Sequence, residues 1–328
     1  MSKVINWGII GAGKIAEKFA QDMTHVQNGH LRAIASRHLD KAKDFAQRHK
    51  IDVSYGTYED LVKDVTIDAI YIATPHSFHK QHSIMALNHK KAVLCEKPLA
   101  MNLKDAEDMI AAAEANNTFL MEALWTAFLP HFNAVENLIE SKHFGQVKTL
   151  EADFGFYSKF DDTSRLFNKA LGGGSLLDIG IYPVFLALST LGTPDHIEAE
   201  ADFFDNGTDA QCDITFYYDK GAKAHLKSTF LENTPTTALF KCEQGDIEMR
   251  SRFYEPSSLI LKPHKGQEEE LNFNVTSLGY MYEIKHVNHI LQNKGKESPV
   301  MSFDRSRILM ATLDAINTCI IKNRPLFF

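Results

Sequence analysis

Three side chains in this sequence have the chemistry to exchange a proton with an alcohol, namely Lys97, Asp178 and Tyr182. Asp178 and Tyr182 lie four residues apart, so they share one face if their segment is helical. They follow the glycine run 172–174, which allows a ligand to approach the backbone closely, and an acid and a phenol there can form a proton relay. A first-turn aspartate and a core tyrosine would show the same spacing. The spacing alone favours neither interpretation.

Lys97 follows the apolar run Ala92–Cys95, within the segment Glu96-Lys97-Pro98. Pro98 biases Lys97 towards an extended conformation and so ends the predicted strand sharply. An ammonium group at a strand end can donate to a substrate hydroxyl or to a developing alkoxide, and it would stabilise a nearby phenolate. A solvated surface lysine is the alternative, but the position at the strand end favours a functional role.

A glycine turn follows the first predicted strand, which covers Val4–Ile10, and a helical pattern begins directly after it. In this order, the first glycine permits a tight turn and the second lets a pyrophosphate approach the backbone. The small residue after them allows the helix to pack on the strand. We therefore expect a dinucleotide site here, although a plain glycine-rich turn is the alternative. The expected cofactor contacts in the turn are Gly11, Gly13, Lys14, Ile15 and Ala16.

The second predicted strand, 31–35, ends in Ser36 and Arg37, and the first acidic residue after it is Asp40. An acid at the end of this strand would bind the ribose 2′-hydroxyl of NAD(H). A hydroxyl and a guanidinium can hold a 2′-phosphate instead. The sequence therefore predicts NADP(H) over NAD(H), with an ordinary polar pair at a strand end as the alternative.

Polar residues also follow two later strands. The run 68–73 stops at Thr74-Pro75, with His79 shortly after, and the run 92–95 stops at Glu96-Lys97. Ligands of a doubly wound sheet bind beyond the carboxyl ends of its strands, so we expect all five of these residues to line the cofactor.

The histidines His76, His79 and His82 recur at a spacing of three, which superficially resembles a metal site. The stretch lacks an HExxH pattern, a cysteine partner and a nearby carboxylate. We therefore predict no metal, and we assign these histidines to capping and cofactor packing.

Strand and helix patterns alternate through residue 123, which predicts an α/β fold with a doubly wound parallel sheet. Beyond it, several strands alternate polar and apolar residues, which predicts an α+β domain with an open, mainly antiparallel sheet. The expected domains are residues 1–123 and 124–328, with a last helix over 305–321 packing back on the core. The polar face of the second sheet could be wet or could form a subunit interface.

Composition restricts the partners. A net charge of −7 argues against a nucleic-acid or anionic membrane surface. No apolar run approaches the ~20 residues of a membrane span, and no signal-peptide pattern precedes the first strand. Four widely spaced cysteines without a CxxC pattern indicate reduced thiols and a cytoplasmic protein.

The motifs, taken in order, resemble those of the glucose–fructose oxidoreductase/inositol dehydrogenase/rhizopine-catabolism (Gfo/Idh/MocA) family. The matching residues are Gly11-x-Gly13-x-x-Ala16, Thr74-Pro75 with His79, Glu96-Lys97-Pro98 and Asp178-x-x-x-Tyr182. The resemblance implies a Rossmann domain followed by an open-faced sheet domain, usually dimerising through the sheet. It also implies NAD(P)-dependent oxidation of sugars and related alcohols.

Many members of this family carry histidine where this chain has Tyr182, so the tyrosine indicates a subgroup. The segments 121–125 and 166–168 are similar to the branch of dimeric trans-dihydrodiol dehydrogenases and NADP-dependent xylose dehydrogenases. By that resemblance Lys97 and Tyr182 are the acid–base pair, and Asp178 assists with substrate hydroxyls. Trp125 and Phe154 would line the substrate pocket.

The expected activity is hydride transfer between nicotinamide C4 and a carbon of a sugar, vicinal diol or cyclic polyol. A non-catalytic, NADP-sensing regulator of the same fold is the alternative, although Lys97, Asp178 and Tyr182 are all present. A zinc-dependent dehydrogenase would need a cysteine ligand set that the sequence does not contain.

Overall fold

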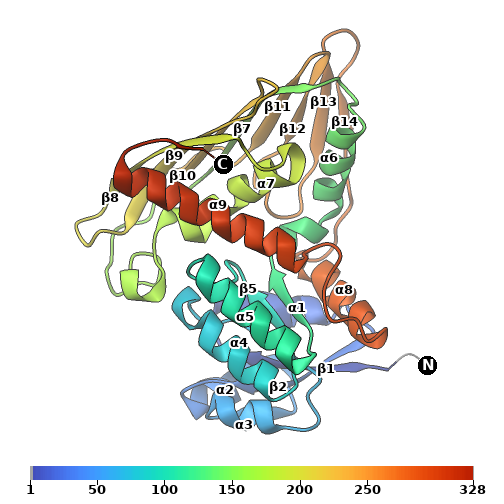
Figure 1. Cartoon of the computed structure of the whole chain (residues 1–328). Coiled ribbons are helices and arrows are strands. Elements are labelled where there is room, and N and C mark those ends of the chain that lie inside the picture. Colours follow the sequence, from blue (N-terminus) through green and yellow to red (C-terminus); the bar gives the residue numbers. More distant parts are fainter. Residues whose placement is uncertain (1–2, 328) are drawn as a thin grey trace. The chain divides into compact units, whose positions relative to one another are not determined.

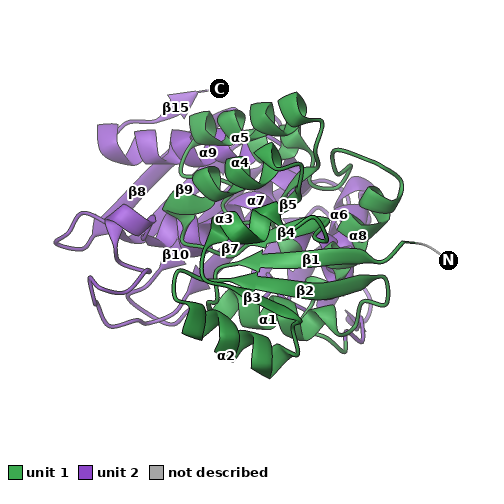
Figure 2. Ribbon diagram, turned by 90° about the horizontal axis from the view of Figure 1, so that it is seen from below, with its two compact units in different colours: residues 1–125, 276–307 green, residues 126–275, 308–328 purple. Residues whose placement is uncertain are grey.

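The computed structural model describes residues 3–327 and divides the chain into two compact units (Figure 1). The first contains residues 1–125 and 276–307, and the second contains residues 126–275 and 308–328 (Figure 2). The sequence predicted a single domain boundary, after residue 123. The structure differs because segment 276–307 returns to the first unit.

Buried polar contacts hold this returning segment on the first unit. The carboxylate of Asp22 accepts hydrogen bonds from the backbone amides of Leu278 (2.9 Å) and Met281 (3.0 Å). The indole of Trp7 donates to the side chain of Asn288 at 2.9 Å. Because these groups are buried, each bond removes a desolvation cost that an unpaired group would carry. The amphipathic pattern of the segment contains no sign of these long-range partners.

The first unit is built on a six-stranded sheet in the order β3-β2-β1-β4-β5-β6. All five neighbouring pairs are parallel, which confirms the predicted doubly wound sheet. The central strands β1, β4 and β5 are almost wholly buried, as expected of strands covered on both faces. The strands are β1 (Ile5–Ile10), β2 (Gly29–Ala35), β3 (Val53–Tyr55), β4 (Ala69–Ile72), β5 (Ala92–Glu96) and β6 (Leu120–Ala123).

Six helices of this unit connect or cover the strands. Two of them begin at a side-chain cap, because Thr57 accepts from the Asp60 amide and Asn102 from the Asp105 amide. The helices are α1 (Lys14–Met23), α2 (Leu39–His49), α3 (Tyr58–Lys63), α4 (His79–Asn88), α5 (Leu103–Asn116) and α8 (Tyr280–Gln292).

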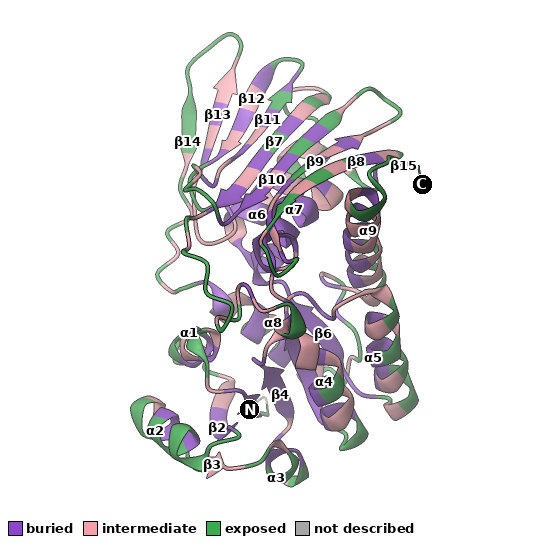
Figure 3. Cartoon of the chain, turned by 90° about the vertical axis from the view of Figure 1, so that its left-hand side faces the viewer, coloured by how far each residue is buried: buried purple, intermediate pink, exposed green. Residues whose placement is uncertain are grey.

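The second unit carries a nine-stranded sheet in the order β14-β13-β12-β11-β7-β10-β9-β8-β15. Only the central pair β7–β10 is parallel, so the predicted mainly antiparallel sheet is confirmed. Buried and exposed residues alternate along its strands (Figure 3). The strands are β7 (Val147–Gly155), β8 (His196–Phe203), β9 (Asp209–Tyr217), β10 (Lys223–Thr229), β11 (Ala238–Cys242), β12 (Gly245–Met249), β13 (Leu259–Pro263), β14 (Glu269–Leu271) and β15 (Leu326–Phe327).

Helices α6 (Pro130–Glu140), α7 (Ile181–Leu191) and α9 (Phe303–Lys322) complete the structure, and α9 passes from the first unit into the second. One expectation needs revision here. The segment 169–191 is long and apolar enough to cross a membrane, although no such run was expected from the sequence. Some 78% of its most apolar window is buried inside the chain, which is the behaviour of a core helix.

Glu283 on α8 is the most isolated buried acid in the part of the chain described. Its side chain is completely buried, and neither carboxyl oxygen has a hydrogen-bond partner. Burial raises the pKa of Glu283 well above its usual range, and the negative charges of Glu96 and Asp22 raise it further. Glu283 is therefore a neutral carboxylic acid in the folded chain.

This state predicts a pH-dependent stability difference for Glu283→Gln. The unfolded chain ionises Glu283 above about pH 4.5 while the folded chain does not, so the folded wild type loses stability as the pH rises. Glu283→Gln removes this effect. The variant should gain up to about 1.4 kcal/mol in unfolding free energy per pH unit relative to wild type above that pH. Urea unfolding at several pH values measures it, with the exposed Glu114→Gln on α5 as control. A constant difference between variant and wild type would contradict the assignment.

Candidate active site

The residues predicted to do chemistry fall in both units, with Lys97 in the first and Asp178 and Tyr182 in the second. Lys97 lies directly after β5 and is half-buried. The preceding carboxylate, Glu96, accepts from the hydroxyl of the fully buried Tyr71 and from the Lys97 amide, the latter at 3.2 Å. On the other side, the Leu99 amide donates to Glu122 on β6 at 2.8 Å. The Lys97–Pro98 peptide bond is cis. The backbone on both sides of Lys97 is therefore held by buried carboxylates.

The glycine turn between β1 and α1 has the two properties that the motif predicts. Gly11 has φ of +103°, and a β-carbon there would lie 2.6 Å from the carbonyl oxygen of Ala73. Gly13 differs, because a β-carbon at that position would meet no atom within 4 Å. No side chain caps the first turn of α1, and Ala16 is fully buried. The helix N-terminus therefore faces an open space in which a phosphate can approach its amides.

A cavity of about 410 Å³ lies beyond the ends of β2, β3 and β4. Arg37 borders it and forms a hydrogen bond with the side chain of Tyr58. His82 forms another wall, with its Nδ1 3.1 Å from the Thr74 hydroxyl and its ring stacked on Phe78. Burial lowers the pKa of His82 to about 4, so this ring is neutral at physiological pH. The cavity thus offers aromatic walls together with two charged side chains, the guanidinium of Arg37 and the carboxylate of Glu59.

Ser36 and Pro75 differ in exposure. Ser36 is buried, and its hydroxyl accepts from the His38 amide at 3.4 Å. Pro75 is half-buried and borders the cavity. Lys14 is exposed and Ile15 half-buried on the first turn of α1.

His79 links the ends of two strands. Its Nδ1 lies 2.8 Å from the carbonyl oxygen of Pro98, and its Nε2 lies 2.9 Å from that of Thr74. The ring is fully buried, and burial lowers its pKa to about 4. Both ring nitrogens therefore face backbone carbonyls that flank the expected cofactor site. Among residues 3–327, no group of three or more His, Cys, Asp or Glu side chains is arranged to hold a metal ion.

In the second unit, Asp178 lies in a π-helical turn, Leu176–Gly180, that leads directly into α7. Pro183 has no amide hydrogen to donate to the Ile179 carbonyl, and a wider turn accommodates that loss. The side chain of Asp178 is 9% exposed and accepts from Arg165 at 2.9 Å. Asp178 is therefore an ion-paired group, and the sequence analysis missed its partner.

Tyr182 on α7 is buried within an aromatic cluster of the second unit. Its ring centroid lies 5.8 Å from that of Phe154 and 4.9 Å from that of Tyr254. Phe154 and Tyr254 are themselves stacked at 4.2 Å. Burial raises the pKa of Tyr254 to about 12, and Glu255 contributes in the same direction. Trp125 belongs to the first unit instead, where it stacks on Tyr280 at 4.3 Å.

Two glycines of the run 172–174 lie in close contact with other parts of their own unit. A β-carbon at Gly173 would lie 2.7 Å from the Leu166 carbonyl oxygen. At Gly174, which has φ of +123°, it would lie 2.1 Å from Asp209 Oδ1. These two glycines therefore allow the chain to pack against itself. Asp209 also accepts from the amide of Leu176 at 2.6 Å, and so caps the turn that carries Asp178.

The sequence did not indicate three of these residues: Tyr254 beside Tyr182, Arg165 as the partner of Asp178, and Glu122 as the acceptor of the Leu99 amide. Tyr254 lies in the irregular segment between β12 and β13, where no periodic pattern marks it. Arg165 directly precedes the segment 166–168, and Glu122 lies in the segment 121–125. The segments 121–125 and 166–168 both supported the family resemblance, so the sequence marked these regions without indicating what Glu122 or Arg165 does.

The parallel sheet with its open glycine turn defines the first unit as a dinucleotide-binding domain, joined to an open-sheet domain. The family model described as "Oxidoreductase family, NAD-binding Rossmann fold" matches residues 5–124, and the "GFO/IDH/MocA C-terminal domain" model matches residues 132–248. The chain belongs to the Gfo/Idh/MocA oxidoreductase family, as its motifs indicated. It is an oxidoreductase with a nicotinamide-dinucleotide domain.

Similar proteins extend over nearly the whole chain. The trans-1,2-dihydrobenzene-1,2-diol dehydrogenase of Xenopus tropicalis is 36% identical over 320 residues, covering 94% of this chain and 96% of that protein. The solved structure of KijD10, a 3-ketoreductase from Actinomadura kijaniata in complex with NADP and TDP-benzene, has a TM-score of 0.86 and 24% identity, covering 96% of this chain and 97% of that chain. The solved structure of a levoglucosan dehydrogenase in complex with NADH and levoglucosan has a TM-score of 0.87 and 19% identity. The match covers 98% of this chain and 99% of that chain.

The contrast between the two glycines of the turn predicts opposite outcomes for two substitutions. Gly13→Val should fold with a loss of only about 1 kcal/mol, because the added side chain meets open space at an ordinary φ of −98°. It should weaken NADPH binding about ten-fold or more, since losing one or two hydrogen bonds to a charged phosphate costs roughly 1.5–3 kcal/mol or more. Gly11→Ala should instead destabilise the chain without any ligand. Thermal unfolding and NADPH fluorescence titration measure both effects. Wild-type affinity in Gly13→Val would contradict the placement of the phosphate.

Proposed function

We propose that the protein is an NADP(H)-dependent dehydrogenase that interconverts a secondary alcohol and a carbonyl on a vicinal diol, sugar or cyclic polyol. The observation that carries the proposal is the half-buried Lys97 at the end of β5, in a chain aligned over 94% of its length with a dihydrodiol dehydrogenase. An NADP⁺-reduction screen across dihydrodiols, pentoses, hexoses and inositols tests it. Tight NADP(H) binding without turnover on any of them would favour the alternative, a non-catalytic sensor of NADP.

When bound, the nicotinamide dinucleotide would supply the hydride acceptor for the reaction. In our proposal Tyr182, as the phenolate, takes the hydroxyl proton as the C–O bond becomes a carbonyl, and it becomes the neutral phenol. Lys97 donates a hydrogen bond to the same oxygen and stabilises its developing negative charge. The ion-paired Asp178 accepts from a neighbouring substrate hydroxyl and orients the diol. Phe154 and Tyr254 form an apolar wall beside Tyr182, and Trp125 is a further proposed substrate contact.

The preference for NADP(H) rests on Arg37. Its guanidinium is exposed at the edge of the 410 Å³ cavity, where a 2′-phosphate attached to a bound adenosine would lie. The similar folds described above hold NADP in one case and NADH in another, so the fold itself does not decide. The buried Ser36 and the absence of an acid at the end of β2 support the same preference.

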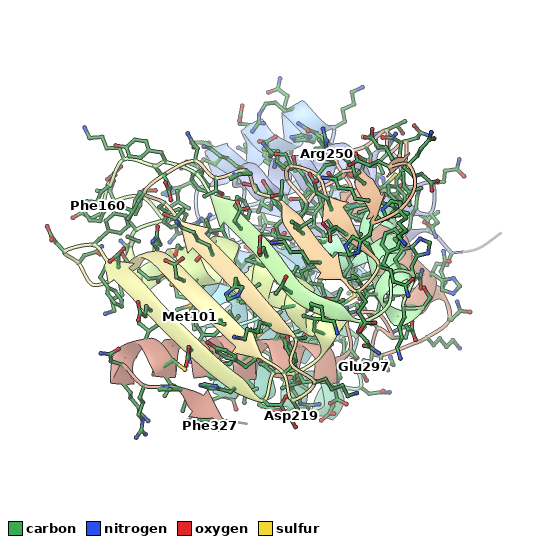
Figure 4. All side chains as sticks on the ribbon, turned by 90° about the horizontal axis from the view of Figure 1, so that it is seen from above. Met101, Phe160, Asp219, Arg250, Glu297 and Phe327 are labelled. Atoms are coloured by element: carbon green, nitrogen blue, oxygen red, sulfur yellow. The ribbon has the colours of Figure 1, made fainter. Side chains whose placement is uncertain are left out.

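We propose that the protein is a homodimer that pairs through the polar face of its nine-stranded sheet. The side chains of this face project towards the viewer in Figure 4, which labels Asp219 and Arg250 near strand ends. Cross-strand ion pairs such as Lys241–Glu151 (2.6 Å) lie on it, with a hollow of about 320 Å³ near Asp213 and His225. Self-complementary charge of this kind suits a twofold interface. A monomer in sedimentation equilibrium would rule the dimer out.

We also propose a cytoplasmic location. All four cysteines are free and buried, which is typical of a reducing compartment. Cell fractionation tests this assignment, and recovery of the protein from an extracellular fraction would contradict it.

Lys97→Met should lower kcat by about 10²-fold or more, because it removes the proposed donor to the substrate oxygen. NADPH affinity should stay within about two-fold, since methionine keeps the length of the side chain. Tyr182→Phe should show a similar loss of kcat. Steady-state kinetics and fluorescence titration provide the two readouts, with the exposed Lys104→Met on α5 as the matched control. Near-wild-type turnover in Lys97→Met with an intact cofactor site would refute the role.

Arg37→Ala should raise the KM for NADP⁺ roughly 10- to 150-fold, the equivalent of about 1.5–3 kcal/mol for a charged hydrogen bond to phosphate. The KM for NAD⁺ should change little, because NAD⁺ carries no 2′-phosphate. The control is Arg32→Ala on β2, where the guanidinium is already paired with Asp52 at 3.2 Å. A clear wild-type preference for NAD⁺ would overturn the proposal.

A further inference from the structure

Glu122 on β6 is a buried acid whose position in the sheet brings it next to Lys97. Only 1% of the residue is exposed. In the register of β5 and β6 it pairs with Cys95, and its successor Ala123 pairs with Glu96. Glu122 therefore lies on the strand next to β5, opposite the residue two positions before Lys97.

Each oxygen of the Glu122 carboxyl has its own donor. Oε1 accepts from the amide of Leu99 at 2.8 Å, and Oε2 accepts from the hydroxyl of Ser306 at 2.7 Å. Ser306 is in the first turn of α9 and is itself 2% exposed. A carboxyl group that accepts on both oxygens is suited to the ionised form. One side chain thus connects β6, the segment that follows Lys97 and the start of α9.

The charges that act on Glu122 come from the end of β5. Burial raises its pKa to about 7, and the negative charge of Glu96 acts in the same direction. The donors Ser306 and Leu99 and the positive charge of Lys97 oppose this rise. From β5 it also faces the Cys95 thiol, which burial keeps protonated by raising its pKa. Glu122 therefore changes charge within the physiological pH range, and Lys97 is the cation that acts on it.

We propose that Glu122 is a positioning residue for Lys97: its carboxylate fixes the backbone beside Lys97 through the Leu99 amide and supplies a negative charge that acts on the ammonium group. The inference rests on the proposed role of Lys97 in proton and oxygen chemistry. Protonation of Glu122 removes the charge and weakens the bond to Leu99, so the chemical step slows. Because Glu122 is buried beneath the surface of its unit, we expect substrate and cofactor binding to stay the same.

The first test is the pH profile of Glu122→Gln. The wild-type kcat should fall as the pH decreases through about 7, because the positioning charge is lost. Glutamine is permanently neutral and can still accept from Leu99, so Glu122→Gln should show a kcat that is reduced on the order of 10- to 100-fold at pH 8. Measured as kcat for carbonyl reduction, in which Tyr182 gives its proton and so adds no acid limb, the acid limb of Glu122→Gln should be absent. Its NADPH affinity should remain within about two-fold of wild type. The matched control is Glu107→Gln on α5. Its surface carboxylate lies 3.0 Å from Arg307, which directly follows Ser306 on α9.

A second variant keeps the test decisive if Glu122→Gln folds poorly. Ser306→Ala removes one donor to the carboxylate, which raises the pKa of Glu122. Its acid limb should therefore move to higher pH while the kcat at high pH approaches that of wild type. A Glu122→Gln enzyme that keeps the wild-type kcat, or that loses rate and keeps the same acid limb, would overturn the inference. An acid limb that stays in place in Ser306→Ala would overturn it too.

The variant Lys97→Met separates this inference from the proposed function. If Lys97→Met retains wild-type turnover, the role of Lys97 fails and the inference fails with it. If Lys97→Met is impaired while Glu122→Gln behaves as wild type at every pH, only the role of Glu122 fails.

Discussion

The first unit depends on one close backbone contact, the approach of Gly11 to the Ala73 carbonyl at the ends of β1 and β4. These strands are neighbours in the sheet although β2 and β3 separate them in sequence, so the chain order reverses at this point. A side chain at position 11 would clash with that carbonyl. Because the contact is this tight, the next residues must turn away, which leaves Gly13 and the first amides of α1 facing open space. The open glycine turn, the cavity beyond β2, β3 and β4, and the end of β5 that precedes Lys97 all lie along the edge defined by this reversal.

Much of the first unit was predictable because its rules are local. Apolar runs bounded by Gly11, Thr74 and Glu96 mark strand ends, and parallel strands of a doubly wound sheet end at one edge. The returning segment 276–307 was not predictable, since its place depends on Asp22 and Trp7, more than 250 residues earlier. In the same way, the run 172–174 looked like a ligand loop because its close neighbours, Leu166 and Asp209, could not be read from spacing.

In the second unit, the sequence pattern predicted the long strands but not the contacts of the candidate site residues. Period-two alternation identified β7 to β10, but the shorter strands β11 to β15 carry too few residues for the pattern to stand out. The four-residue spacing of Asp178 and Tyr182 implied a regular helix, whereas Asp178 lies in a π-helical turn before Pro183. That wider turn directs Asp178 towards Arg165, while Tyr182 joins Phe154 and Tyr254. The sequence identified both residues, and only tertiary packing determines what each one contacts.

Two buried acids of the first unit show why burial alone does not determine charge. Glu283 and Glu122 are equally buried and lie in the same unit, yet only Glu122 has a donor for each oxygen. Without donors, Glu283 faces the charges of Glu96 and Asp22 and remains neutral far above the usual pKa of a carboxyl. With two donors and Lys97 as a cation, Glu122 titrates near pH 7. Hydrogen-bond donors therefore select which of these acids can respond to pH, and the one that can is bonded to the segment that carries Lys97.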